Sequence, residues 1–275
     1  MSNFDFAAAI AARPSGATKG QLVAAYGDPT QGCTRTGKGR FEPSAAFRRN
    51  MVKIPLSELP GFPDYAVPGT KISGVTFHRS VAPVFVATWA ELHRRGLTGR
   101  LRTYDGATTY RHMLWNYSNP VSLHAYGAAI DFDARWNGYG IPHNQMQIDR
   151  DVVKCFEECG WEWGGRWGRS DGMHFQWTDP LPGVRQPEWR DAMAAGAPPK
   201  QRPTPAPPPD AVPGTHYLYG RCRVPYPKGQ LVQEDAYRWA SVATDAQGRV
   251  LLGPDGLARV VLFDDERATK KGLVK

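Results

Sequence analysis

Two short stretches combine histidine and aspartate at spacings that suit metal chemistry. The first, Ser-Leu-His-Ala-Tyr-Gly-Ala-Ala-Ile-Asp-Phe-Asp, offers His124 and Asp131, and the second, Asp-Gly-Met-His-Phe-Gln-Trp, offers Asp171 and His174. Imidazole nitrogen and carboxylate oxygen suit zinc, and a hydrolytic zinc takes three protein ligands and keeps a fourth position for water. We therefore predict His124, Asp131 and His174 as candidate ligands, with Asp171 as a candidate base for the proton of that water. The alternative is two unrelated strands with satisfied histidines and surface acids.

The elements that must position these side chains are two short strands. The end of the first stretch alternates, so Ala128, Ile130 and Phe132 would face one side of a sheet while Asp131 and Asp133 face the other. A core strand would carry no acids on its second face, which favours a site there. Asp133 would then either orient a ligand or be solvated. In the second stretch, a tight turn at the glycine after Asp171 would bring Asp171 and His174 to one rim.

These residues resemble the zinc peptidoglycan peptidases of the VanY-type D-alanyl-D-alanine carboxypeptidase and L-alanyl-D-glutamate endopeptidase family, which includes many phage endolysins. The family pattern Ser-x-His-x-x-Gly-x-Ala-x-Asp is met in full from Ser122 to Asp131, and its later acid-x-x-His by Asp171 and His174. Residues 160–167, Gly-Trp-Glu-Trp-Gly-Gly-Arg-Trp, match a third family run. The resemblance covers roughly residues 50–180.

The resemblance implies one zinc ion per chain on His124, Asp131 and His174, with Asp171 as general base. Many members carry glutamate at the base position, so the shorter aspartate is a departure. The family also uses an arginine upstream of the first ligand, and Arg111 is the best match at a looser spacing. A guanidinium there would hold a peptide carboxylate or stabilise an oxyanion, whereas its alternative is a surface arginine.

Two further residues are predicted to contact substrate. Ser122 hydrogen-bonds near the metal in the family's manner, or simply makes a turn. Trp163 lies among glycines that let a ligand approach the backbone, so its ring would line a peptide groove, or else it packs in the core. His112 and His143 are rival ligands, for which we favour a supporting or surface role.

Length, composition and charge limit the class of protein and the kinds of partner. The chain has 275 residues, 41% hydrophobic and 22% charged, which is typical of a globular protein with one sizeable core and a small second module. A net charge of +8 favours anionic partners such as cell-wall polymers or nucleic acid, or simply keeps the protein in solution. No basic-aromatic pattern of a nucleic-acid module is present. Cys155 and Cys159 share a helix face and are predicted to be buried free thiols rather than a metal site. No apolar run is long enough to span a membrane.

The order of elements predicts an α+β fold. We expect helices at 21–26, 81–95 and 149–159, and strands at 71–77 and 101–104 besides the two above. They would form a small antiparallel sheet with helices packed on one side and a zinc cleft on the other. This catalytic domain would span residues 1–196.

A Pro-rich linker at 197–213 would then lead to a small C-terminal module at 214–275, either wall-binding or a plain appendage. In the module we expect a helix at 231–243 and a hairpin ending at 257–263.

We therefore expect a zinc metallopeptidase that cleaves bacterial peptidoglycan stem peptides or cross-links, as an endopeptidase or a carboxypeptidase. It would act as a monomer, with no nucleic-acid partner. The N-terminus does not resemble a signal peptide, so the protein would be made in the cytoplasm and reach the wall by phage-type release or virion delivery. A non-catalytic wall-binding or virion structural protein on the same fold is the alternative. A basic nucleic-acid-binding protein would instead show salt-sensitive DNA retention without metal.

Overall fold

The computed structural model describes residues 4–196, 216–218, 230–235, 238–242 and 260–264. The chain divides into two compact units, Met1–Pro199 and Lys200–Lys275. The linker predicted at 197–213 lies outside the described residues. Among the helices that are described, none has the length and apolar character needed to cross a membrane.

Most of the first unit's regular structure is short. The α-helices are α1 (Phe6–Ala11), α2 (Lys19–Tyr26), α3 (Ala45–Arg48), α4 (Ala82–Arg94), α5 (Ala134–Asn137) and α6 (Arg150–Glu158). The 3-10 turns are η1 (Leu56–Glu58), η2 (Thr98–Arg100), η3 (Met113–Trp115), η4 (Leu123–Tyr126), η5 (His143–Gln145) and η6 (Gly164–Arg166). The strands are β1 (Thr34–Gly37), β2 (Arg40–Glu42), β3 (Met51–Pro55), β4 (Gly74–His78), β5 (Tyr104–Gly106), β6 (Ala129–Phe132), β7 (Glu162–Trp163) and β8 (His174–Gln176).

A four-stranded antiparallel sheet of order β5-β6-β8-β7 forms the centre of this unit. Two-stranded antiparallel sheets, β1-β2 and β3-β4, lie outside it. In the central sheet, β6 and β8 pair with Asp131 directly opposite His174. The prediction of a mixed fold with small antiparallel sheets is therefore confirmed.

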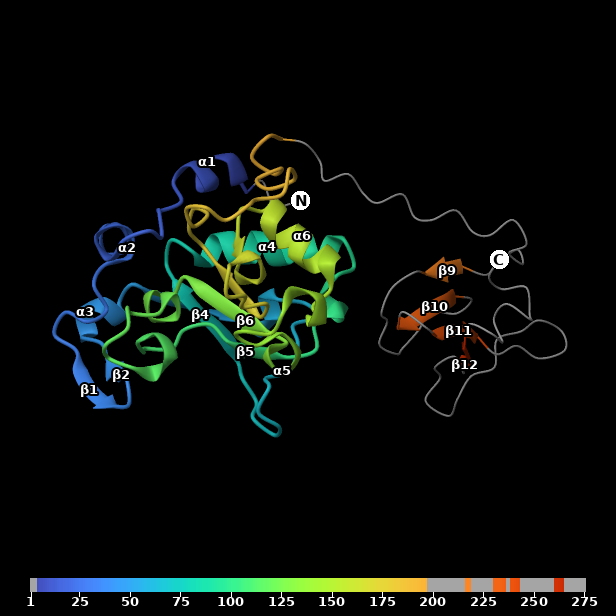
Figure 1. Ribbon diagram of the computed structural model, residues 1–275, viewed down its shortest axis with the longest axis horizontal. Helices are drawn as coiled ribbons and strands as arrows, with labels where there is room; N and C mark the ends of the chain where they lie inside the picture. Colours follow the sequence, from blue (N-terminus) through green and yellow to red (C-terminus); the bar gives the residue numbers. More distant parts are fainter. Residues whose placement is uncertain (1–3, 197–215, 219–229, 236–237, 243–259, 265–275) are drawn as a thin grey trace, which may run out of the picture. The chain divides into compact units, whose positions relative to one another are not determined.

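Helices α4 and α6 pack together against this unit's strands (Figure 1). Phe132 of β6 stacks on Trp89 of α4, and Phe175 of β8 stacks on Phe156 of α6 at a centroid distance of 4.2 Å. Since side chains alternate along a strand, Asp131 and His174 then point to the opposite face from Phe132 and Phe175. The apolar side of the sheet thus holds the helices and leaves the other side for polar groups.

The signals that begin and end these helices were readable in the sequence. Asp149 caps α6 by accepting hydrogen bonds from the backbone N–H groups of Asp151 and Val152. Gly160 follows α6 with a φ of 97°, where an added Cβ would lie 2.7 Å from the Ile10 side chain. The helices predicted at 21–26, 81–95 and 149–159 are accordingly confirmed as α2, α4 and α6.

The C-terminal unit contradicts one prediction. Two described segments form the antiparallel strands β10 (Gln230–Asp235) and β11 (Arg238–Val242), so the helix predicted at 231–243 is wrong. The sheet order is β12-β11-β10-β9, with β9 (His216–Leu218) parallel to β10 and β12 (Val260–Asp264) antiparallel to β11. Pairing with neighbouring strands decides the structure here, because strand propensity depends on context more than helix propensity does. The other arm of the predicted hairpin lies outside the described residues.

Candidate metal centre

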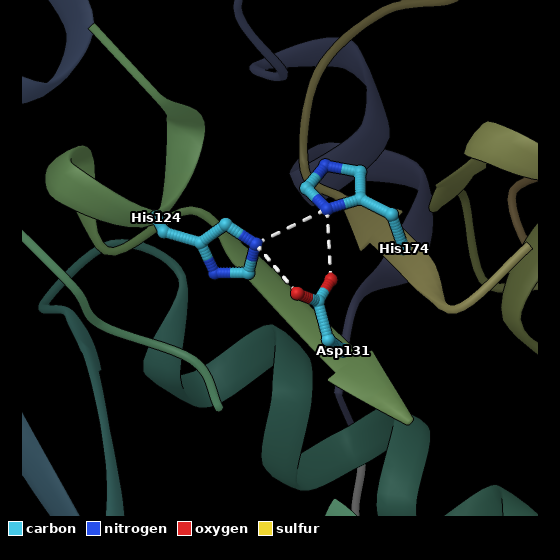
Figure 2. A group of neighbouring side chains, drawn as sticks. All are labelled: His124, Asp131 and His174. Atoms are coloured by element: carbon cyan, nitrogen blue, oxygen red, sulfur yellow. Dashed lines mark hydrogen bonds and ion pairs between the residues drawn. The ribbon is translucent and has the colours of Figure 1, made fainter. Parts of the chain in front are cut away.

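Three side chains from separate parts of the chain point toward one another (Figure 2). His124 Nε2 lies 3.1 Å from Asp131 Oδ2, His174 Nδ1 lies 2.9 Å from Asp131 Oδ1, and the two ring nitrogens are 3.2 Å apart. All three residues are buried, with exposed fractions of 3% for His124 and 7% for the other two. The structure therefore brings together the predicted ligands His124, Asp131 and His174.

The local fold explains this convergence. The β6–β8 register places Asp131 beside His174, and η4 carries His124 just before β6 begins. Between η4 and β6, Gly127 adopts a left-handed φ of 67°, and a Cβ there would lie 2.3 Å from Met51 Cε and 2.6 Å from the backbone nitrogen of His78. Only glycine fits this reversal without strain, so Gly127 sets the path by which His124 reaches Asp131.

In each histidine ring, the inner nitrogen faces the other two residues of the group, and the outer nitrogen contacts a hydrogen-bond acceptor elsewhere. His124 Nδ1 lies 2.5 Å from the carbonyl oxygen of Ala107, which accepts only, so Nδ1 carries the proton. His174 Nε2 lies 3.2 Å from Gln176 Oε1, while the amide nitrogen of Gln176 donates to Glu162 Oε2 at 3.2 Å. Since a carboxylate accepts, the Gln176 amide is oriented with its oxygen toward His174, and Nε2 of His174 is the protonated nitrogen.

This protonation pattern suits a metal ion. In neutral rings, both inner nitrogens are bare acceptors that face each other and a carboxylate, so nothing among the three supplies a donor. Tetrahedral zinc with ligand bonds of about 2.0–2.1 Å sets its ligand atoms roughly 3.4 Å apart. The two ring nitrogens are 3.2 Å apart, and one ligand atom from each of the three residues lies within 4.8 Å of the others. The donor set and its geometry therefore fit a zinc ion with three protein ligands.

Without a metal ion, a proton must lie between these acceptor atoms to reduce their mutual repulsion. Burial opposes charge on Asp131, but the charges and hydrogen bonds of His124 and His174 outweigh it and hold the pKa of Asp131 below its ordinary value. Burial likewise lowers the pKa of His174, yet the hydrogen bond and charge of Asp131 raise it more, so the pKa of His174 is above its ordinary value. A metal ion that binds this group would therefore compete with protonation.

Asp171 is held next to the ligand group. Its backbone N–H donates to the carbonyl of Gly164, and its own carbonyl accepts from the backbone N–H of His174, which forms the predicted tight turn. Burial raises the pKa of Asp171 to about 6, and the charges of His174, Asp131, His124 and Arg111 all act on it. Its Oδ1 is buried and has no hydrogen-bond partner among the described residues. This unsatisfied carboxyl oxygen is available to exchange a proton with a water or a substrate.

Arg111 lies within electrostatic range of both acids. Burial lowers the pKa of Arg111, while Asp131 and Asp171 act in the opposite direction. Its guanidinium stacks over the Trp115 ring at 5.0 Å, and its backbone carbonyl accepts from Ser122. The structure thus brings Arg111 into the neighbourhood of the group, and its catalytic role stays a prediction.

The two predicted substrate contacts are both buried. Ser122, 4% exposed, precedes η4, and its backbone links Arg111 to the turn that carries His124. Trp163, 1% exposed, donates its indole N–H to the carbonyl of Gly172 at 2.8 Å. Both side chains are therefore buried, Trp163 as part of the hydrophobic core, and contact with substrate stays a prediction for each.

The remaining candidates lie outside the group. His112 Nδ1 contacts the carbonyl of Asn119, and His143 Nδ1 contacts the carbonyl of Gly165. Asp133 is 1% exposed and accepts hydrogen bonds from the backbone N–H groups of Arg102 and Thr103. Asp133 therefore neither orients a ligand nor faces solvent, and both alternatives considered for it are wrong. Cys155 and Cys159 are buried free thiols, as predicted.

Sequence reasoning missed Gln176 and Glu162. Glu162 is 1% exposed, and its Oε1 also accepts from the Trp167 indole and the Leu181 backbone. Gln176 is two residues after His174 on β8, so strand alternation places both on one face. The alternation along β8 could therefore have identified Gln176 from the sequence. Its partner Glu162 could not be identified in this way, because it lies on the neighbouring strand β7.

Comparison with known proteins gives one family match. Residues 116–177 match the family model described as D-alanyl-D-alanine carboxypeptidase. The matched stretch contains the three candidate ligands and Asp171, whereas Arg111 lies before it. No curated protein and no solved structure matches the chain. The match confirms the resemblance to the VanY-type peptidases over this stretch.

Proposed function

We propose that the protein is a zinc-dependent peptidase that hydrolyses a peptide bond in the stem peptides or cross-links of bacterial peptidoglycan. One observation carries the proposal: His124, Asp131 and His174 each present an acceptor atom, these atoms lie within 4.8 Å of one another, and the outer nitrogen of each ring is already bonded. The family match supports a peptidase acting on peptidoglycan.

Each residue has a role that follows from its position. A zinc ion held by the three ligands would supply Lewis-acid chemistry, polarising a carbonyl and lowering the pKa of a water. Asp171 accepts a proton from the attacking water and returns it to the leaving amine, because its pKa of about 6 allows exchange in both directions near neutrality. Arg111 stabilises negative charge that develops on the carbonyl oxygen.

The wider setting is part of the same proposal. The enzyme acts as a monomer on the wall after phage-type release or virion delivery, and the C-terminal unit tethers it to the wall. Tethering raises the effective concentration of substrate without any new contact at the catalytic centre.

Metal content and product analysis test the proposal together. The purified protein should bind about one zinc per chain and release fragments from purified peptidoglycan, and chelation should stop the release. Mass spectrometry of the new termini would identify the bond and distinguish an endopeptidase from a carboxypeptidase. Zinc binding without any new terminus would favour a non-catalytic wall-binding protein instead.

Two variants separate the roles of neighbouring residues. His174→Ala should lose zinc, whereas Asp171→Asn should keep zinc and lose turnover, since only the second leaves all three ligands in place. Wild-type turnover in Asp171→Asn would reject the assignment of the base.

A further inference from the structure

A cavity of about 440 Å³ lies beside the candidate metal centre. Its lining includes Trp167, whose ring centroid is 5.4 Å from that of His174, and Ser170, which directly precedes Asp171. This volume is within the range of small-ligand sites, about 300–1,000 Å³. A peptide held with its scissile bond at Asp171 and His174 would therefore place a neighbouring residue at this cavity.

The charged residues that line the cavity are all basic. Arg166, Arg185 and His143 contribute to it, and no aspartate or glutamate does so within the part of the chain that the structure describes. Arg166 is already paired, since its Nη2 donates to Glu157 Oε2 at 2.8 Å. Arg185 is exposed and makes no hydrogen bond or ion pair with any described residue. Arg185 is thus the cation that remains for a ligand.

Two other polar side chains of the cavity, His143 and Ser170, already have a hydrogen-bond partner in the protein. His143 Nδ1 faces the Gly165 carbonyl at 3.1 Å, so it carries a proton and leaves Nε2 for another partner. The Ser170 hydroxyl donates to the Ile141 carbonyl at 2.5 Å. Arginine binds carboxylates through two parallel hydrogen bonds, so a carboxylate is the group that Arg185 is best suited to recognise.

We propose that this cavity is a subsite for a carboxylate-bearing residue of the peptide substrate, with Arg185 as its ion-pair partner. The inference rests on the proposed peptidase function. It predicts that the protein selects stem peptides whose acidic groups are free over peptides in which they are amidated.

Matched peptides test the subsite. The zinc-loaded full chain is given one synthetic stem peptide with free carboxylates and the same peptide with its carboxylates amidated. In Arg185→Gln, KM for the free acid should rise about tenfold, while KM for the amidated peptide stays unchanged. Arg185→Lys should recover part of the loss. Arg135→Gln is the control, because Arg135 is also exposed and does not line the cavity.

The outcomes separate the subsite from the peptidase. Equal KM values for the two peptides in the wild type, or equal effects of Arg185→Gln and Arg135→Gln, would overturn the subsite while leaving the peptidase intact. If neither peptide is cleaved, the peptidase proposal fails, and calorimetric binding of the same peptides still decides the subsite. Tighter binding of the free acid that depends on Arg185 would support it, and equal binding would reject it.

Discussion

Replacing Gln176 by methionine should weaken zinc binding although Gln176 does not itself reach the metal. Gln176 Oε1 accepts from His174 Nε2 at 3.2 Å, and its amide nitrogen donates to Glu162 Oε2 at 3.2 Å and to Thr178 Oγ1 at 2.9 Å. Methionine has a similar volume but no acceptor at that position. His174 would then lose the bond that keeps its inner nitrogen unprotonated and its ring in place.

The size of the effect follows from these contacts. Loss of a bond that orients a metal-ligating histidine typically costs about 10–100-fold in metal affinity. That range corresponds to about 1.4–2.7 kcal/mol at 25 °C. The metal-free protein should also lose about 1–3 kcal/mol of unfolding free energy, because Glu162 Oε2 stays buried and loses its donor.

Zinc affinity is measured by competition with a chromophoric chelator, and unfolding free energy by urea titration of the metal-free protein. Thr178→Val is the matched control. It removes a buried partner of the same amide but leaves the bond to His174, so it should lower stability without changing zinc affinity.

A double variant provides a rescue. In Gln176→Glu with Glu162→Gln, the new carboxylate accepts from His174 Nε2. The new amide keeps its oxygen for the Trp167 indole and the Leu181 backbone and donates toward position 176. Zinc affinity should recover to within a few-fold of wild type. Wild-type affinity in Gln176→Met, or no recovery in the double variant, would refute the role of this hydrogen bond.

Three further predictions concern the turn and the titrating groups. Gly127→Ala should lower the unfolding free energy by at least about 2 kcal/mol, because it strains the left-handed backbone and overpacks against Met51. Gly99→Ala is the control: the space around Gly99 is open, so the melting temperature should change little. The value of kcat/KM should fall as the pH decreases, with a midpoint at or below about 6, because Asp171 works as a carboxylate and a bound cation favours the ionised form of Asp171. A value of kcat/KM that stays constant down to about pH 4 while zinc is retained would contradict this assignment. Zinc affinity should rise with pH through and above the ordinary pKa range of histidine, because the pKa of His174 is raised and zinc must displace its proton. Calorimetry in buffers of different ionisation enthalpy should detect the proton that zinc binding releases. If no proton is released, the assigned protonation of His174 is wrong.

The sequence by itself predicted helices α2, α4 and α6 of the first unit and the residues of the candidate site. Apolar spacing, the Asp149 cap and the glycines after the helices act within a few residues, so helices α4 and α6 could be read directly. The residue types at 124, 131, 171 and 174 indicated a candidate metal site, and the resemblance to a peptidase family indicated hydrolysis as its chemistry.

Only the tertiary structure decided which polar groups complete the site. The β6–β8 register sets Asp131 against His174, while β7 brings Glu162 to orient Gln176. Pairing also made residues 230–235 and 238–242 strands instead of the predicted helix. Strands β6 and β8 are distant in sequence, so their hydrogen bonds leave no local pattern, and the protonation of a ligand histidine depends on such partners.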